Sequence, residues 1–145
     1  YHIPCVALRY SIVLGPNQKF LDREHGALRG FVDMAKSGED VIAHEDGKQL
    51  RDFVHIDDVI EAHLVVAENS EADYQIFNVG AGKSIEVIEM AEYIANKFGV
   101  KAIAGGKKRI NTPRHSLMNI NKLKNLGWLP KKTWQEAVSD YILNL

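Results

Sequence analysis

The sequence predicts an α/β fold, and three of its segments carry that prediction. Residues 5–14 are almost continuously apolar and β-branched, with Gly15-Pro16 directly after them. Such a run is typical of a strand covered on both faces inside a parallel sheet. Residues 74–79 form a second run of this kind, and a tight loop separates them from a helical pattern over residues 84–99. Strand, short loop and helix in succession form the repeating unit of α/β proteins.

A helix and a hairpin are predicted between these segments. Apolar residues recur at helical spacing over residues 25–38, and a glycine at the end of this stretch stops the helix. Two short extended runs follow, at residues 40–44 and 50–55. They are joined through Asp46-Gly47, a dipeptide that favours tight turns because it tolerates a positive φ. The sequence therefore predicts a β-hairpin.

The later helices are predicted from their caps and their apolar positions. Asp57-Asp58 supplies an N-cap and negative charge for a helix that runs to about residue 69. Apolar residues spread around much of the circumference of this helix, so we expect it to be well buried. In the last helix, Thr133 and Glu136 form a capping box in front of an apolar stripe.

Composition limits the class of protein. With 145 residues, of which 46% are hydrophobic, the chain has the length of one ordinary domain and can bury a core. Its 18 basic and 19 acidic side chains nearly cancel, which argues against nucleic acid and lipid surfaces as partners. No stretch approaches the roughly 18 apolar residues of a membrane span. The single cysteine, Cys5, cannot form an internal disulfide, which favours a reducing compartment, with the cytoplasm as the expectation.

Two motifs suggest phosphate binding or catalysis, but each lacks the neighbouring residues that this function requires. Residues 80–84 (GAGKS) lie between a strand and a helix, yet they lack the first glycine of a phosphate loop and the third glycine of a dinucleotide fingerprint. A tight structural turn is the favoured interpretation. Tyr93 and Lys97 have the spacing at which an ammonium group can lower the pKa of a phenol. No glycine-rich dinucleotide site precedes them, so we expect a surface pair.

No catalytic residue and no metal site is predicted. The six histidines show none of the spacings of metal ligands, so a site would have to be assembled from distant residues. Cys5 lies in an apolar run and is expected to be a buried, inert thiol. The sequence also lacks the Gly-x-Ser-x-Gly turn that presents a nucleophilic serine.

Residues 51–59 (RDFVHIDDV) hold the strongest candidate for a binding residue. Arg51 at the mouth of the predicted hairpin presents a planar fork that suits bidentate phosphate binding, and Asp52 could hold or screen that fork. These residues alone leave two interpretations open. One is a phosphate ligand, and the other is a surface arginine paired with an aspartate.

The same segment closely resembles the signature of the extended short-chain dehydrogenase/reductase family, the NAD-dependent nucleotide-sugar epimerases and dehydratases related to UDP-glucose 4-epimerase. Three further blocks resemble that family in order and spacing. They are residues 8–18 (LRYSIVLGPNQ), 77–82 (FNVGAG) and 119–130 (NINKLKNLGWLP). Together the four blocks cover almost the whole chain, which makes the resemblance far more specific than any single motif.

The resemblance implies the last strands of a Rossmann-type parallel sheet plus a small α/β substrate-binding domain. Residues 1–14 and 50–79 are then the late strands and helix of the dinucleotide-domain sheet, and residues 15–49 and 80–145 form the nucleotide-sugar-binding domain. In that family the glycine fingerprint and the catalytic Tyr-x-x-x-Lys precede the first strand seen here. Because the sequence starts at Tyr1, we expect a fragment that is inactive on its own.

The resemblance also implies a set of binding residues. Arg51 and Arg109 are implied to be the two cations on the diphosphate of a UDP- or dTDP-linked sugar. Ser11 is implied to touch the nicotinamide end of NAD, and Ser116 to lie near the sugar. The residues implied to line the nucleotide pocket are Ala27, Leu28, Ala43 and His44. There are two departures: Ser11-Ile12 replaces a Phe-Asn pair of many epimerases, and Thr112 replaces a common aspartate.

The implied activity of the parent enzyme is epimerisation, in which NAD oxidises the C4 hydroxyl of the sugar to a 4-keto intermediate that is then reduced again. A 4,6-dehydratase or a 4-keto reductase stays open as an alternative, as does a non-catalytic nucleotide sensor or interaction domain. NAD is implied as cofactor of the parent, and none is expected on this chain alone. The exposed strand edges of a partial sheet predict a homodimer or association with the missing amino-terminal half.

Overall fold

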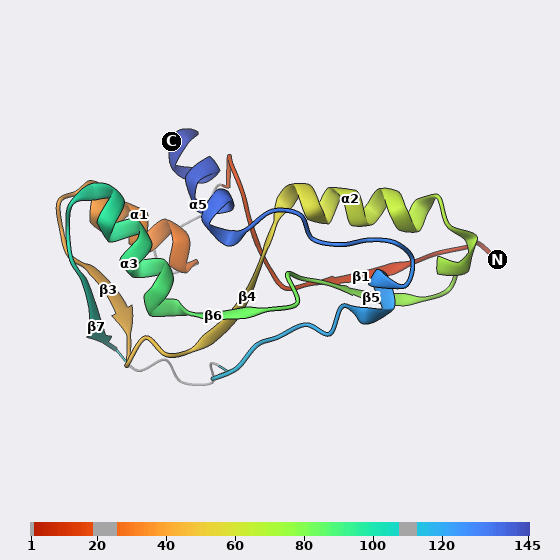
Figure 1. Cartoon of the computed structure of the whole chain (residues 1–145), viewed down its shortest axis with the longest axis horizontal. Coiled ribbons are helices and arrows are strands. Elements are labelled where there is room, and N and C mark those ends of the chain that lie inside the picture. The colour runs from red at the N-terminus through yellow and green to blue at the C-terminus, as the bar shows by residue number, and fades with distance from the viewer. Residues whose placement is uncertain (1, 19–25, 108–112) are drawn as a thin grey trace.

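The computed structural model describes residues 2–18, 26–107 and 113–145, and it confirms the α/β fold (Figure 1). The strands are β1 (Ala7–Tyr10), β2 (Ile12–Leu14), β3 (Val41–His44), β4 (Leu50–His55), β5 (Ile76–Val79), β6 (Ser84–Glu86) and β7 (Ala102–Gly106). The helices are α1 (Ala27–Lys36), α2 (Ile56–Ala67), α3 (Val87–Phe98), α4 (Asn121–Lys124) and α5 (Trp134–Leu143), with a 3₁₀ turn η1 (Ser70–Ala72). Parallel pairing joins β1 to β5, β2 to β4 and β3 to β7, whereas β6 runs antiparallel to β4.

The apolar run at residues 5–14 forms two short strands instead of one. The change of partner falls at Ser11, whose amide donates to the carbonyl of Val79 at 2.8 Å. β1 therefore borders β5, and β2 borders β4. The prediction of a strand covered on both faces is wrong for β1, because three of its four residues are exposed, among them Tyr10 at 43%. Cys5 is exposed as well, so the expected burial of its thiol is also wrong.

The hairpin predicted over residues 40–55 is wrong, although its turn exists. Gly47 has a φ of 69°, and its amide donates to the carbonyl of His44 at 3.0 Å. Beyond the turn, the amide of Ile88 in the first turn of α3 donates to the carbonyl of Gly47 at 2.9 Å. The start of α3 thus takes a carbonyl group beside the turn that a hairpin ladder would use. As a result β3 pairs with β7, and β4 pairs with β2 and β6.

Helix α2 begins at His55 and not at the predicted pair of aspartates. The N-cap is His55, because its Nδ1 accepts the amide of Asp57 at 3.0 Å. Asp58 lies in the first turn, where it is 3% exposed. Its two carboxylate oxygens accept the amides of Lys131 at 2.9 Å and Lys132 at 3.1 Å. Asp58 therefore fixes the segment that leads into α5.

Only one side of α2 is buried. Val59, Ala62 and Val66 pack inward, whereas Ile60 and Leu64 are 52% and 58% exposed. The prediction that this helix is well buried is therefore wrong for its outer face. An apolar outer face is unusual for a helix that borders solvent, since such faces are normally polar.

Two apolar clusters hold the elements together. One packs α1, α3 and α5 against β2, β3 and β4, with Phe31 and Ile94 among its members. The other lies under α2 and contains Phe77 of β5 and Trp128 near the carboxyl end. The division into two domains along the predicted boundaries stays a prediction. No helix of the described residues is long and apolar enough to cross a membrane.

Candidate functional site

A pocket of about 330 Å³ lies between α1 and the strands β2 and β4. This volume falls within the range of small-molecule sites. Apolar side chains such as Leu28, Phe31 and Phe53 form much of its wall. The polar groups of the wall include His44, Glu45, Gln49, Arg51 and Arg114. Such a wall can hold an aromatic ring on its apolar side and an anion on its cationic side.

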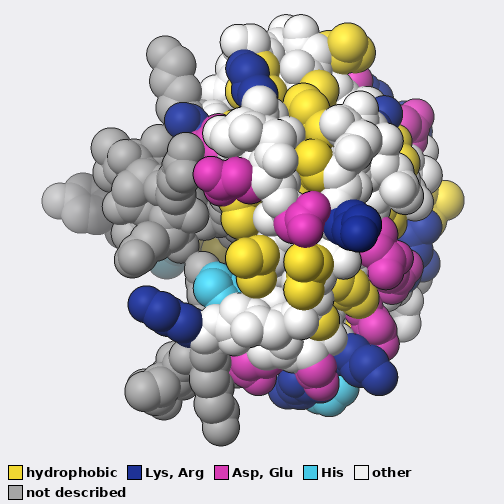
Figure 2. Space-filling model, turned by 90° about the vertical axis from the view of Figure 1, so that its left-hand side faces the viewer, with side chains coloured by type: hydrophobic (Ala, Val, Ile, Leu, Met, Phe, Trp, Pro, Cys, Tyr) yellow, Lys and Arg dark blue, Asp and Glu magenta, His cyan; other side chains and the backbone are white. Residues whose placement is uncertain are grey.

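The end of the molecule that carries β3 and β7 faces the viewer in Figure 2, with hydrophobic side chains near the centre of that face and charged ones around them. Ile42 of β3 and Ile103 of β7 are register partners here, and they are 44% and 45% exposed. Ile42 also lines the pocket. The apolar wall of the pocket therefore continues onto an open surface.

Four residues predicted to bind substrate line this one pocket: Ala27, Leu28, His44 and Arg51. Ala43 does not, because side chains alternate along β3 and that of Ala43 is fully buried in the core. Arg109 and Thr112 lie outside the described residues.

The two predicted serines do not line the pocket. Ser11 lies between β1 and β2, next to the pocket residue Ile12, and its hydroxyl oxygen is buried with no hydrogen-bond partner among the described residues. A buried hydroxyl of this kind can still serve a ligand that comes from outside this chain. Ser116 is half-buried, and its amide donates to the carbonyl of Leu50 at 3.1 Å.

Arg51 reaches the pocket because side chains alternate along β4. Gln49, Arg51 and Phe53 all line the pocket, whereas Asp52 between them is fully buried and turned away. The guanidinium of Arg51 donates from Nη1 to the carbonyl of Leu50 at 2.7 Å. The interpretation in which Asp52 holds or screens the Arg51 fork is therefore wrong.

Asp52 instead clamps three distant pieces of backbone. Its Oδ1 accepts the amide of Ala81 at 2.7 Å, and its Oδ2 accepts the amides of Gly82 at 3.3 Å and Met118 at 3.1 Å. A Cβ atom on Gly80 would lie 2.8 Å from Oδ2, so only glycine fits there. Amides that a phosphate loop would direct at a ligand are thus used by a carboxylate. This arrangement supports the structural interpretation of residues 80–84.

Four polar residues of the pocket wall were not predicted as binding residues from the sequence: Gln18, Glu45, Gln49 and Arg114. Gln49 is 8% exposed and donates from Nε2 to the carbonyl of His44 at 3.1 Å, which ties the end of β3 to the start of β4. Arg114 reaches the pocket from a segment that follows Arg51 by 63 residues in the sequence. Its spacing to Arg51 carries no periodic signal. Arg114 could have been found from the sequence only if the pairing of its segment with β4 had been predicted.

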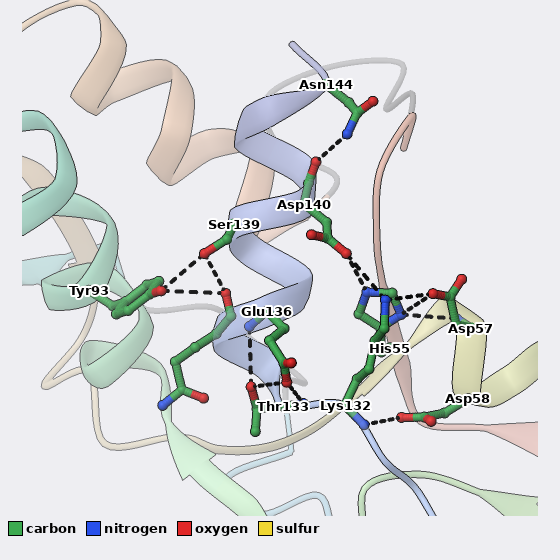
Figure 3. A network of polar contacts seen from close by, with 11 residues as sticks. His55, Asp57, Asp58, Tyr93, Lys132, Thr133, Glu136, Ser139, Asp140 and Asn144 are labelled. Atoms are coloured by element: carbon green, nitrogen blue, oxygen red, sulfur yellow. Dashed lines mark hydrogen bonds and ion pairs between the residues drawn. The ribbon is translucent and has the colours of Figure 1, made fainter.

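His55, the histidine within residues 51–59, belongs to a polar network between α2 and α5 (Figure 3). His55 is 1% exposed, and its Nε2 donates to Asp140 at 3.1 Å while its Nδ1 caps α2. Lys132 donates to Asp57 at 2.7 Å, and this hydrogen bond holds the pKa of Asp57 below its ordinary value. His55 therefore joins two helices and is not directed at the pocket.

Tyr93 of the Tyr-x-x-x-Lys pair on α3 faces α5 (Figure 3). The Tyr93 hydroxyl lies 3.1 Å from the hydroxyl of Ser139 on α5. Lys97 places its ammonium 4.9 Å from the centre of the Tyr93 ring, over the ring face. Its charge is therefore not directed at the phenol oxygen, which supports the interpretation of a surface pair. The His, Cys, Asp and Glu side chains of the described ranges form no group of three that could hold a metal ion.

Comparison with known proteins gives a consistent set of similarities. Residues 1–80 match the model of the family described as "NAD dependent epimerase/dehydratase family". A dTDP-L-rhamnose 4-epimerase of Burkholderia thailandensis is 29% identical over 94% of this chain and 38% of its own length. A putative UDP-glucose 4-epimerase of Methanocaldococcus jannaschii is 32% identical over 95% of this chain and 44% of its own length.

A solved structure agrees with these sequences. The UDP-glucose 4-epimerase of Thermotoga maritima, crystallised with UDP-glucose, superposes with a TM-score of 0.87 at 29% identity, over 99% of this chain and 46% of that chain. The chain thus spans less than half the length of each of these three proteins.

Proposed function

The chain belongs to the NAD-dependent epimerase/dehydratase family, and on this premise we propose that its pocket binds the nucleoside diphosphate of a UDP- or dTDP-linked sugar. The observation that carries the proposal is the convergence of Arg51, the first turn of α1 and an apolar wall on one cavity. The residues come from separate elements, and four of them are those that the family resemblance implies.

The chemistry of the wall suits the two parts of a nucleotide. Gly26 and Ala27 at the start of α1 line the pocket, and the N-cap residue Gly26 has no side chain that could cap the helix. Amides of the first turn and the helix dipole favour an anion at such an N-terminus. The guanidinium of Arg51 adds a full positive charge that is always present. Phe31 and Phe53 offer apolar surface for a base.

In the whole enzyme we assign this chain a binding task and not the chemical step. NAD, when bound, supplies the hydride chemistry that converts the C4 hydroxyl to a keto group and back. The pocket would hold the nucleotide far from that carbon, so that remote binding energy positions the sugar. The buried, unpaired hydroxyl of Ser11 fits a hydrogen bond to the nicotinamide end of NAD. Dehydration or reduction of a 4-keto sugar starts from the same binding mode.

A chemical-shift titration tests this site. We expect saturating UDP-glucose or dTDP-glucose to shift the backbone amide signals of Ala27, Gly30 and Arg51, which line the pocket. Signals of Ala81 and Gly82 should stay in place, because their amides are bonded to Asp52. Shifts confined to residues 80–84 would contradict the proposal and revive the phosphate-loop interpretation.

The outer face of α2 and the open edge of β1 form an association surface in this proposal. Tyr10, Ile60 and Leu64 are each between 43% and 58% exposed. Since β1 has β5 as its one described neighbour, its free edge can extend a parallel sheet. We propose that a dinucleotide-binding half covers this surface, and that the chain alone self-associates through it. The lone cysteine fits a reducing compartment such as the cytoplasm.

A charge on this surface should prevent self-association. Leu64→Lys is expected to raise the dimer dissociation constant at least about tenfold, because an unpaired ammonium would be buried in an apolar contact. Sedimentation velocity over a concentration series measures the effect. Ile103→Lys is the matched control, since Ile103 is 45% exposed on β7 at the opposite end of the molecule (Figure 1). A wild-type chain that sediments as a monomer at every concentration would contradict the proposal.

A further inference from the structure

Arg114 lies beside Arg51 on the same side of two adjoining backbones. The segment that carries Arg114 runs parallel to the start of β4, with Leu50 opposite His115. The amide of Leu50 donates to the carbonyl of Arg114 at 2.9 Å. Residues that lie opposite each other on paired backbones point to the same face, so Leu50 and His115 share one face. Arg51 and Arg114 are the chain neighbours of these two residues, and both therefore lie on the other face. Both line the pocket, which agrees with this geometry.

Two carboxylates at the end of β3 hold the Arg114 side chain. Its Nη1 donates to Oδ1 of Asp46 at 2.8 Å, and its Nη2 donates to Oδ2 at 2.5 Å. Glu45 follows at 3.8 Å from Nη1. This bidentate pairing holds the pKa of Asp46 at about 2. A guanidinium that meets two carboxylate oxygens in a plane has the geometry that also suits two oxygens of a phosphate.

The contact between Arg114 and Asp46 is open to exchange. The two side chains are 43% and 48% exposed, and exposed ion pairs contribute little to stability. Glu45 has a φ of 55°, a region that favours glycine, so the backbone is strained at the pocket wall. Strain of this kind is typical of residues that clamp a ligand. A phosphate with a higher charge than a carboxylate can therefore compete for the guanidinium.

We propose that Arg114 is a further cation for the diphosphate and that Asp46 is a built-in competitor, which the phosphate displaces from the guanidinium on binding. The inference rests on the proposed function, since it names a further residue of the same site. It places Arg51 and Arg114 at the pocket from two adjoining segments of backbone. It also gives Asp46 and Arg114 opposite effects on affinity.

Isosteric substitutions test the inference by titration calorimetry with UDP. Arg114→Gln is expected to weaken binding about tenfold, the lower end for a charge-assisted contact. Asp46→Asn is expected to tighten binding, because the amide no longer holds the guanidinium. Arg114→Lys keeps the charge without the fork and should lie between wild type and Arg114→Gln. Weaker binding by Asp46→Asn, or unchanged binding by Arg114→Gln, would overturn the inference.

A second measurement follows the carboxyl group itself. The carboxyl ¹³C signal of Asp46, titrated with acid, should report a pKa of about 2 in the free chain. With saturating UDP we expect this pKa to rise toward the ordinary value of 3.8, because the guanidinium has moved to the phosphate. If the pKa of Asp46 does not change with saturating UDP, phosphate does not displace Asp46 from Arg114, and the inference is overturned while the proposed function is not. Absence of any UDP binding by the wild-type chain overturns both.

Discussion

Replacing Asp52 by alanine is expected to lower the free energy of unfolding by about 3 kcal/mol or more, the range for breaking a buried charged cluster. Asp52 is fully buried and accepts three backbone amides, those of Ala81, Gly82 and Met118. Alanine would remove the one side chain that accepts these three amides. Denaturant unfolding, extrapolated to water at a constant m-value, measures the loss.

Asp52→Asn is the matched control for this prediction. Asparagine has the same size and keeps one acceptor oxygen, but its NH₂ group would face a backbone amide. We therefore expect a loss between that of Asp52→Ala and zero. If Asp52→Ala costs less than about 1 kcal/mol, the carboxylate clamp does not hold the three segments together.

Arg51→Gln is expected to weaken the binding of UDP-glucose about a hundredfold, or roughly 2 to 3 kcal/mol, as for a charge-assisted hydrogen bond to a dianion. Arg51 lines the pocket from β4, whereas its neighbour Asp52 is turned away. Arg51→Lys keeps the charge but not the fork, so a smaller loss is expected. Titration calorimetry gives each affinity.

Arg29→Gln is the control for Arg51→Gln. Arg29 lies on α1, where it pairs with Asp33 at 2.9 Å, and it does not line the pocket. The same loss of charge at this position should leave the affinity within about twofold of wild type, because a charge several ångströms away is screened by water and salt. If Arg29→Gln and Arg51→Gln lowered the affinity for UDP-glucose equally, the effect would come from the net charge of the chain and not from a specific site.

Local patterns in the sequence were sufficient to predict three helices. α1, α3 and α5 follow from apolar spacing, and the capping box of α5 is present, with Thr133 accepting the Glu136 amide at 3.3 Å. The predicted start of α3 at Ser84 is wrong, because residues 84–86 form β6 and the helix begins at Val87. Signals of this kind involve residues three or four apart, so the segment alone decides them. The cap of α2 was misplaced because His55 can accept an amide as an aspartate does.

Strand pairing could not be predicted in the same way. The turn at Gly47 was correct, yet the amide of Ile88 about 40 residues later uses its carbonyl. Such a competition for a carbonyl group depends on the tertiary fold, and the periodicity of the sequence does not reveal it. The open face of α2 was missed for a related reason, since Ile60 and Leu64 have the apolar pattern of a buried helix but are 52% and 58% exposed.

The candidate site was predicted in part. Arg51 was a candidate from its residue type and its place in the predicted hairpin, whereas His44 came from the family resemblance alone, and both line one pocket. Arg114 was missed because its place beside β4 depends on a single long-range bridge between Leu50 and His115. Asp52 was assigned to the wrong neighbour for the same reason: its partners at residues 80–82 and 118 are distant in sequence.

Calorimetric titration of UDP, UDP-glucose and uridine tests whether this pocket recognises the diphosphate of a nucleotide sugar. We expect UDP and UDP-glucose to bind saturably and uridine to bind at least about a hundredfold more weakly, because only the first two bring the anion that Arg51 can hold. Their affinity should fall as salt is added. Equal affinities for uridine and UDP, or no saturable binding of either nucleotide, would contradict the account.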